Sequence, residues 1–337
     1  MHFGAVRKLA QRGRLGALPA FLRTMNEFSR ACFLVAAARA GVLEALRAGP
    51  RSAPELLEAR GLAAKAGPGL VAWLEVGVSL GELSLDAGEY ALSGRLARVL
   101  AESSNDDMLA MLEELTELHH RLLLESPERL AKSEQFTLAD QDGEVVARSS
   151  RMLEPLIEAA LDEIVPRAGR FRVLEIGCGS GTYLGYMSRR NPELSAQGIE
   201  LQASVADQAL RNLRAWGVDD RVAVACADVR SWSHGEPFDL VTMHNNIYYF
   251  GIDARVDVLR HVRQFLKPGG RLLLTTATRG GSPSGSTLSL WGAMTEGCAP
   301  LPTPDELCRD LQRAGFQRAR SESLAGPFER FHAFWAN

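Results

Sequence analysis

The chain is poor in cysteine, and the arrangement of its cysteines excludes two kinds of scaffold. Its 337 residues include five cysteines, an odd number, with no Cys-x-x-Cys pair. Disulfide frameworks use even numbers of cysteines, and zinc sites use closely spaced ones. The sequence therefore predicts neither a disulfide framework nor a metal site, and it favours a reducing cytoplasm as the location.

Long hydrophobic runs and an excess of positive charge are also lacking. The longest helical apolar stretch covers residues 31–38, well short of the roughly 18 residues typical of a membrane-spanning helix. The net charge is −3, whereas a surface that binds nucleic acid throughout is usually basic. We therefore expect neither a membrane nor a nucleic acid as partner.

The first 26 residues have no acidic side chain but carry five basic ones. An organellar transit peptide is one interpretation, although such peptides are rich in serine and this segment is not. We favour a solvated basic leader or docking arm over residues 1–26.

Residues 27–104 are expected to form small helices followed by a hairpin. Ser52 and Glu55 have the spacing of a capping box, which predicts a helix that starts there. Residues 83–85 and 90–92 alternate in polarity as strands do, around a turn that contains Gly88. Three helices and a hairpin predict a winged helix.

Residues 105–167 are expected to form a helical linker that roofs a pocket. Apolar residues and one histidine recur at 4-3-4-3 spacing, which places them on one face of a helix. These residues are Met108, Leu112, Leu115, His119 and Leu122.

From residue 168 to residue 337 short apolar strands alternate with amphipathic helices, which predicts a parallel α/β sheet. The strand candidates are residues 172–176, 196–199, 222–225, 238–243 and 271–276, with a last antiparallel hairpin near 316–324 and 331–335. The loop at 278–287 is rich in glycine and serine; we considered it as a lid and, equally, as an exposed crossover.

One stretch carries most of the chemical information. Residues 173–182 read VLEIGCGSGT, an apolar strand that ends in Glu175 and leads into a glycine-rich turn and a helix. Glycines allow a backbone to approach a ligand closely. The dinucleotide fingerprint needs Gly-x-Gly-x-x-Gly, but here Gly177, Gly179 and Gly181 are followed by Thr182.

Together with four later motifs, this stretch resembles the class I S-adenosylmethionine-dependent methyltransferases. The motifs occur in the family's order over about residues 171–337. They are Glu175–Gly181, Gly198–Leu201, Ala227–Val229, Phe238–Val241 and Leu266–Gly270. The resemblance implies a Rossmann-like seven-stranded methyltransferase domain, preceded by an all-helical or winged-helix domain.

The resemblance also implies S-adenosyl-L-methionine as cofactor and assigns residues to it. Glu200 would accept hydrogen bonds from the ribose hydroxyls in bidentate geometry. Asp228 and the Val229 backbone would bind adenine, and Leu201 would pack on its face. Glu175 would favour the methionyl ammonium. The full set is Glu175, Gly177, Gly179, Gly181, Glu200, Leu201, Asp228, Val229, His244 and Asn245, the last two through backbone groups.

The front module resembles the amino-terminal region of small-molecule O-methyltransferases, which implies a homodimer and a small-molecule substrate. In the plant-type members a catalytic histidine follows the fourth strand, but residues 248–250 here are Tyr-Tyr-Phe. We therefore considered His244 as a base or cofactor contact, and Tyr248 as a catalytic or substrate-orienting residue. The remaining substrate candidates are His119, His120 and Arg148.

Other interpretations stay open at this stage. Taken alone, Asp228 and Glu200 are solvated surface acids, and His119 is a core histidine. The chain could bind the cofactor without methylating, or without catalysis. A winged-helix DNA-binding regulator is a third possibility, although Lys65 is the one basic residue between Gly61 and Gly94.

Overall fold

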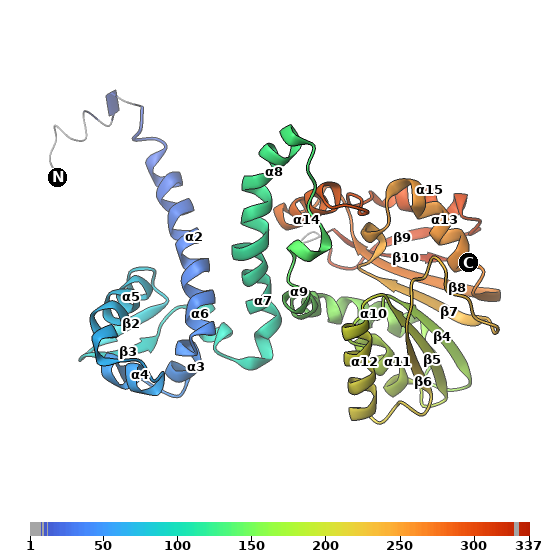
Figure 1. Cartoon of the computed structure of the whole chain (residues 1–337), viewed down its shortest axis with the longest axis horizontal. Helices are drawn as coiled ribbons and strands as arrows, with labels where there is room; N and C mark the ends of the chain where they lie inside the picture. Colours follow the sequence, from blue (N-terminus) through green and yellow to red (C-terminus); the bar gives the residue numbers. More distant parts are fainter. Residues whose placement is uncertain (1–7, 9, 12, 327–329) are drawn as a thin grey trace. The chain divides into compact units, whose positions relative to one another are not determined.

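The computed structural model describes residues 8, 10–11, 13–326 and 330–337, which form two compact units (Figure 1). Unit 1 holds the chain up to His120 together with Glu144–Ser149, and unit 2 holds Arg121–Gly143 and Ser150–Asn337. The chain thus passes between the units three times. Over the described residues, no helix combines the length and apolar content needed to cross a membrane.

Unit 1 packs helices around a small antiparallel sheet with strand order β1-β3-β2. The core consists of side chains such as Leu34, Leu56 and Leu74, which are fully buried. Its elements are α2 (Leu18–Arg39), α3 (Val42–Arg47), β1 (Arg51–Ser52), α4 (Ala53–Ala59), α5 (Gly67–Ser79), β2 (Leu83–Asp86), β3 (Glu89–Leu92), α6 (Arg95–Leu100), α7 (Asp106–Glu114) and α9 (Gly143–Ser149).

The first helices follow local signals in the sequence. Ser52 accepts a hydrogen bond from the Glu55 backbone, and the Glu55 carboxylate accepts one in return, so the predicted capping box is confirmed. Gly41, in the left-handed region at φ 65°, separates α2 from α3. The predicted leader falls partly outside the described residues, and α2 runs across its expected boundary at residue 26.

The helix after α7 departs from the predicted pattern. Residues Leu115–His119 form a π-helical turn before α8 (His120–Lys132) begins. This wider turn shifts the register of the apolar positions. Leu115 is 46% exposed whereas Leu122 is fully buried. The prediction of one continuous apolar stripe is therefore wrong at this turn.

Unit 2 contains a seven-stranded mixed sheet with order β6-β5-β4-β7-β8-β10-β9. The first five strands in this order are parallel, and β10 runs antiparallel between β8 and β9. The predicted Rossmann-like fold and its terminal hairpin are confirmed. The strands are β4 (Phe171–Ile176), β5 (Leu194–Glu200), β6 (Val222–Cys226), β7 (Phe238–His244), β8 (Leu266–Ala277), β9 (Arg320–Ser323) and β10 (Phe331–Ala336).

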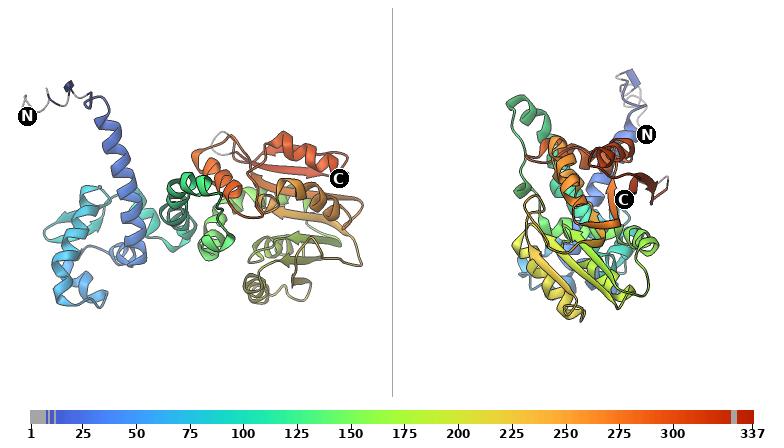
Figure 2. Two further views of the ribbon diagram at one scale, coloured as in Figure 1. Left: turned by 45° about the horizontal axis from the view of Figure 1, so that its top comes forward. Right: turned by 90° about the vertical axis from the view of Figure 1, so that its right-hand side faces the viewer.

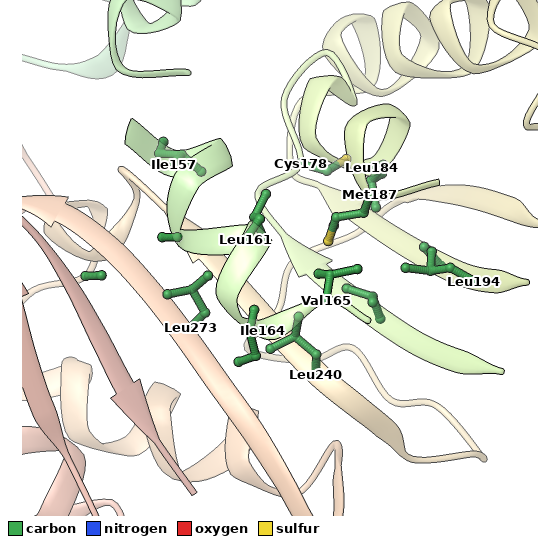
Figure 3. Close-up of a cluster of buried hydrophobic side chains, with 14 of the residues drawn as sticks. Ile157, Leu161, Ile164, Val165, Cys178, Leu184, Met187, Leu194, Leu240 and Leu273 are labelled. Atoms are coloured by element: carbon green, nitrogen blue, oxygen red, sulfur yellow. The ribbon is translucent and has the colours of Figure 1, made fainter. Parts of the chain in front are cut away.

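Helices cover both faces of this sheet (Figure 2). Because neighbouring strand residues point to opposite faces, Leu240 and Val241 of β7 belong to two different hydrophobic clusters. Figure 3 shows the first cluster, in which Ile164 and Val165 lie near Leu240. The helices are α10 (Glu154–Ile164), α11 (Thr182–Arg190), α12 (Ala203–Ala215), α13 (Ile252–Arg263), α14 (Pro283–Met294) and α15 (Pro304–Arg313).

The loop considered as a lid is shorter than predicted. Helix α14 begins at Pro283, and the Ser282 hydroxyl accepts a hydrogen bond from the Gly285 backbone at 3.2 Å. Trp291 on this helix is buried against Phe136, with ring centroids 5.8 Å apart. The prediction of a loop over residues 283–287 is therefore wrong, because a capped helix occupies them.

Candidate cofactor site

The glycine-rich turn lies at the carboxyl end of β4 and is held against β5. The backbone N–H groups of Gly177 and Cys178 both donate to the Ile199 carbonyl, at 2.8 and 3.1 Å. Gly179 has φ 53°, and no atom lies within 4 Å of the position that a Cβ would take. The turn therefore presents bare backbone to open space, as the close approach of a ligand requires.

Glu200 ends the neighbouring strand β5 and is bound to the same turn. Its Oε2 accepts from the Gly179 backbone at 3.1 Å, and its Oε1 accepts from the Gln202 backbone at 3.1 Å. Leu201, which follows, is 57% exposed. These bonds fix the carboxylate at the strand tip, where a ribose can reach it, and they leave an apolar side chain available beside it.

Asp228 lies in the loop after β6. Arg230 donates to both of its carboxylate oxygens, at 2.6 to 3.0 Å. These hydrogen bonds lower the pKa of Asp228, which keeps its carboxylate charged. The adjacent Val229 is buried. The sequence analysis did not predict the ion pair with Arg230. The position of Arg230, two residues after Asp228, was a signal that could have indicated it.

Glu175 is the most unusual side chain of the site. It is 1% exposed, and its Oε2 has no hydrogen-bond partner. Burial, with the Glu200 charge as a smaller cause, raises the pKa of Glu175 well above its ordinary value. An unsatisfied buried carboxylate oxygen is costly, and a cationic group with N–H donors would satisfy it. The site thus fits the ammonium of an S-adenosylmethionine molecule.

His244 ends β7 and is wholly enclosed. Its Nδ1 lies 2.8 Å from the Thr275 Oγ1, and the Tyr183 ring packs edge-on against it with centroids 4.8 Å apart. Burial lowers the pKa of His244 to about 3. The imidazole is therefore neutral at physiological pH and a poor proton acceptor there. Asn245, with φ 51°, donates its backbone N–H to the Thr275 carbonyl at 2.8 Å.

Sequence reasoning missed Tyr183 and Thr275. Tyr183 is the second residue of α11, directly after the glycine-rich turn, so its position was a usable signal. Thr275 stands in an apolar strand, where nothing in the pattern distinguishes it from a packing residue.

Tyr248 lies in the 3₁₀ turn that follows β7, within unit 2. Its side chain is buried, and its ring lies 4.7 Å from that of Tyr249. Its backbone carbonyl accepts from the Ala299 N–H at 2.8 Å, which ties the turn to the segment after α14.

The other three substrate candidates lie in unit 1. His119 Nε2 is 3.7 Å from the Glu114 carboxylate, and burial lowers its pKa. His120 has a buried Nδ1 without a hydrogen-bond partner. Arg148 donates to Asp106 at 2.9 Å and to Glu113 at 2.8 Å, so its guanidinium is engaged within this unit. Within the described ranges, no three His, Cys, Asp or Glu side chains gather as metal ligands would.

Comparisons with known proteins agree with this geometry. A family model described as a methyltransferase domain matches residues 173–270. The protein-L-isoaspartate O-methyltransferase 2 of Marinobacter nauticus is 30% identical over 166 residues, which cover 47% of this chain and 71% of that protein. The chain spans about half the length of the first curated relatives that it matches.

Solved structures share the fold over almost the whole chain. The mitomycin 7-O-methyltransferase is 21% identical and covers 98% of this chain and 99% of its own, with a TM-score of 0.77. Human N-acetylserotonin methyltransferase, solved in complex with SAM, is 16% identical. The match covers 95% of this chain and 97% of that protein, with a TM-score of 0.74.

The family model, the Marinobacter relative and the carboxylates around the glycine-rich turn lead to one assignment. The chain belongs to the class I S-adenosylmethionine-dependent methyltransferases, with S-adenosylmethionine as its cofactor.

Proposed function

We propose that the chain transfers the methyl group of S-adenosylmethionine to a small-molecule acceptor, at an oxygen atom. The observation that carries the proposal is the sheet edge where Glu175, Glu200 and the bare backbone of Gly179 meet. The similarity to small-molecule O-methyltransferases supports the acceptor class. When bound, the cofactor supplies a methyl group already activated on a sulfonium.

The chain's own residues bind and orient the two reactants. Glu200 accepts hydrogen bonds from the ribose hydroxyls, and Asp228 accepts one from the adenine amino group. Glu175 binds the ammonium. Holding both reactants in line supplies much of the rate enhancement in such a transfer.

An acceptor hydroxyl must also lose its proton. His244 is unsuited to that task, because burial lowers its pKa to about 3 and its imidazole therefore holds a proton poorly. We assign His244 to support the cofactor pocket and Tyr248 to orient the acceptor. Arg148 is left out of the proposed acceptor contacts because two carboxylates hold it; the roles of His119 and His120 stay predictions.

We further propose that the protein is a homodimer through its amino-terminal region. The second half of α2 is buried in unit 1, but its first half exposes a row of large apolar side chains. They recur three to four residues apart, which places them on one helix face. They are Leu18, Phe21, Leu22, Met25 and Phe28, between 37% and 59% exposed. A second copy of the same face would cover this row.

A substrate screen with methyl-labelled S-adenosylmethionine tests the reaction. We expect the label in a methyl group bonded to an acceptor oxygen, with one S-adenosylhomocysteine formed for each methyl transferred. Glu200→Ala should abolish both the labelling of the acceptor and the formation of S-adenosylhomocysteine. Glu236→Ala removes an exposed glutamate just before the amino end of β7, away from the carboxyl ends that carry the site, and should reduce neither the label nor the S-adenosylhomocysteine. Tight cofactor binding with no S-adenosylhomocysteine formed from any acceptor would contradict methyl transfer.

A further inference from the structure

Asn246 joins the segment after β7 to the start of the glycine-rich turn. Its side-chain Nδ2 donates to the Ile176 carbonyl at 2.6 Å, and Ile176 is the last residue of β4. A Cβ added to Gly177 would come within 2.8 Å of the same nitrogen. The amide therefore packs directly on the backbone that leads from Glu175 into the turn.

This contact determines which way the amide faces. A carbonyl can only accept a hydrogen bond, so the nitrogen of the Asn246 amide must face Ile176 and the oxygen must face away. That oxygen, Oδ1, is buried and has no hydrogen-bond partner. Since the amide is planar, the bond to Ile176 fixes the position of Oδ1 as well.

Glu175 adds a second unsatisfied acceptor one residue before Ile176. Its Oε2 is buried and unpartnered, and within the described part of the chain no ion pair joins Glu175 to a cation. The charged group that acts on Glu175 is itself acidic, namely Glu200 on β5, and it adds to the effect of burial in raising the pKa of Glu175. Two buried acceptors without donors are thus placed at one strand end.

Both acceptors lie at the end of β4, so a group bound there with several N–H donors would satisfy them together. An ammonium carries three N–H donors and one positive charge, whereas water would leave the carboxylate without a counter-charge. Buried acceptors that stay unpaired cost free energy, so a site that holds two of them is built for a donor-rich ligand.

We propose that the Asn246 amide oxygen is a second acceptor for the α-ammonium of the cofactor, beside the Glu175 carboxylate. The Asn246 side chain thereby has two tasks, because its nitrogen holds the glycine-rich turn while its oxygen binds the ligand. This inference rests on the assigned cofactor site and names a residue that the family motifs did not indicate.

The test compares two ligands that differ in the ammonium. S-adenosylhomocysteine carries the amino-acid portion, whereas 5′-methylthioadenosine lacks it and keeps the nucleoside. Binding of both is measured by titration calorimetry, with competition for the weaker ligand, to wild type and to Asn246→Ala. We expect the substitution to raise the dissociation constant of S-adenosylhomocysteine about tenfold or more. The dissociation constant of 5′-methylthioadenosine should change by less than about twofold.

A second variant and a matched control separate binding from folding. Asn246→Asp keeps acceptor oxygens but loses the donor to Ile176, so it should retain more S-adenosylhomocysteine affinity than Asn246→Ala. Asn191→Asp changes a buried amide that donates to the Gly169 carbonyl at 3.0 Å, away from the strand ends that carry the site. It should lower thermal stability and leave the ratio of the two affinities unchanged.

Equal losses for both ligands in Asn246→Ala would show that the side chain only positions the turn, and would overturn the proposal. Unchanged binding of both ligands would overturn it as well. Because the assay needs no methyl acceptor, failure of this inference is distinct from failure of the proposed methyl transfer, which the labelled-cofactor screen detects.

Discussion

At the residue scale, burial decides the charge of two titratable groups at the site. Glu175 and His244 are both enclosed, and in both cases burial disfavours the charged form. The carboxyl group is held towards its protonated form and the imidazole towards its neutral form. A cationic ligand reverses this for Glu175, because the ammonium supplies the missing counter-charge.

This gives a prediction for the ligand-free protein. The folded pKa of Glu175 lies above the unfolded value of 4.5, so its contribution to stability is lost as pH rises through the folded pKa. Glu175→Gln has no proton to lose. We expect the variant to gain thermal stability relative to wild type at about pH 8 and no such gain at about pH 4.

Thermal unfolding of both proteins across this pH range provides the measurement. Other titrating groups, His244 among them, are common to both proteins and cancel in the difference. A difference that does not change with pH would contradict the raised pKa. The same variant should bind S-adenosylmethionine more weakly, because a neutral amide cannot supply the negative charge that pairs with the ammonium.

Asp228 gives a second prediction at this scale. Its partner Arg230 is exposed and Asp228 itself is partly exposed, and ion pairs in contact with solvent add little to stability. Asp228→Ala should therefore leave the unfolding temperature nearly unchanged and weaken S-adenosylmethionine binding by about 1–3 kcal/mol. Arg230→Ala is the matched control, since it breaks the same pair without removing the proposed adenine acceptor. If both variants lost affinity equally, the adenine role of Asp228 would be refuted.

At the element scale, a buried carboxylate links three helices of unit 1. Glu113 on α7 is 3% exposed; Arg39 of α2 donates to it at 2.8 Å, and Arg148 of α9 does so at the same distance. Segment Glu144–Ser149 belongs to unit 1 although both flanking stretches belong to unit 2. The pair between Arg148 and Glu113, together with the bonds from Arg148 to Asp106 and from Ser149 to Glu114, binds this short segment to α7.

Glu113→Gln should therefore lower the free energy of unfolding of unit 1 by about 2 kcal/mol. This is less than for a fully buried ion pair, because both guanidinium groups remain partly in contact with solvent. Differential scanning calorimetry measures the loss. Glu117→Gln is the control, because Glu117 also pairs with Arg39 but is about half exposed; its effect should stay below about 1 kcal/mol. Similar losses in both variants would contradict a special role for the buried residue.

Local signals in the sequence were sufficient to predict the regular helices and strands. They failed where the local structure depends on contacts between residues far apart in the chain. The capping box at Ser52 and the strands of unit 2 are set by residues close together in the chain. The π turn at Leu115–His119 leaves no local mark, since its sequence suits an ordinary helix. At α14 the signal was local but was outweighed: Ser282 followed by Pro283 is typical of a helix start, in a stretch whose glycines and serines are typical of a loop.

At the scale of the whole molecule, the site was easier to predict than its internal contacts. Five ordered motifs, through their resemblance to the family, indicated Glu175, Glu200 and Asp228 as cofactor ligands, and this assignment stays a prediction. Asn246 comes from a loop whose course depends on tertiary packing, so no spacing rule indicated it, whereas the position of Arg230 two residues after Asp228 was a usable local signal. The division into two units was not predicted either, because it falls at His120, inside the expected helical linker.

The exposed face of α2 provides a prediction for the assembly. Phe21→Glu places a charge in the middle of the apolar row, twice in a symmetric dimer, so the dimer dissociation constant should rise at least about a hundredfold. Ala20→Glu, on the other side of the same helix and also exposed, should leave it unchanged. Sedimentation velocity distinguishes the outcomes, and a wild-type protein that is monomeric at high concentration would refute the interface.

The most direct test of the whole account is titration calorimetry of the folded chain with S-adenosylmethionine. The account predicts one binding site per chain and an affinity that falls in Glu200→Gln, whose amide can no longer accept two charge-assisted bonds from the ribose. A folded wild-type protein that takes up no S-adenosylmethionine, or a Glu200→Gln variant that binds it as tightly as wild type, would contradict it.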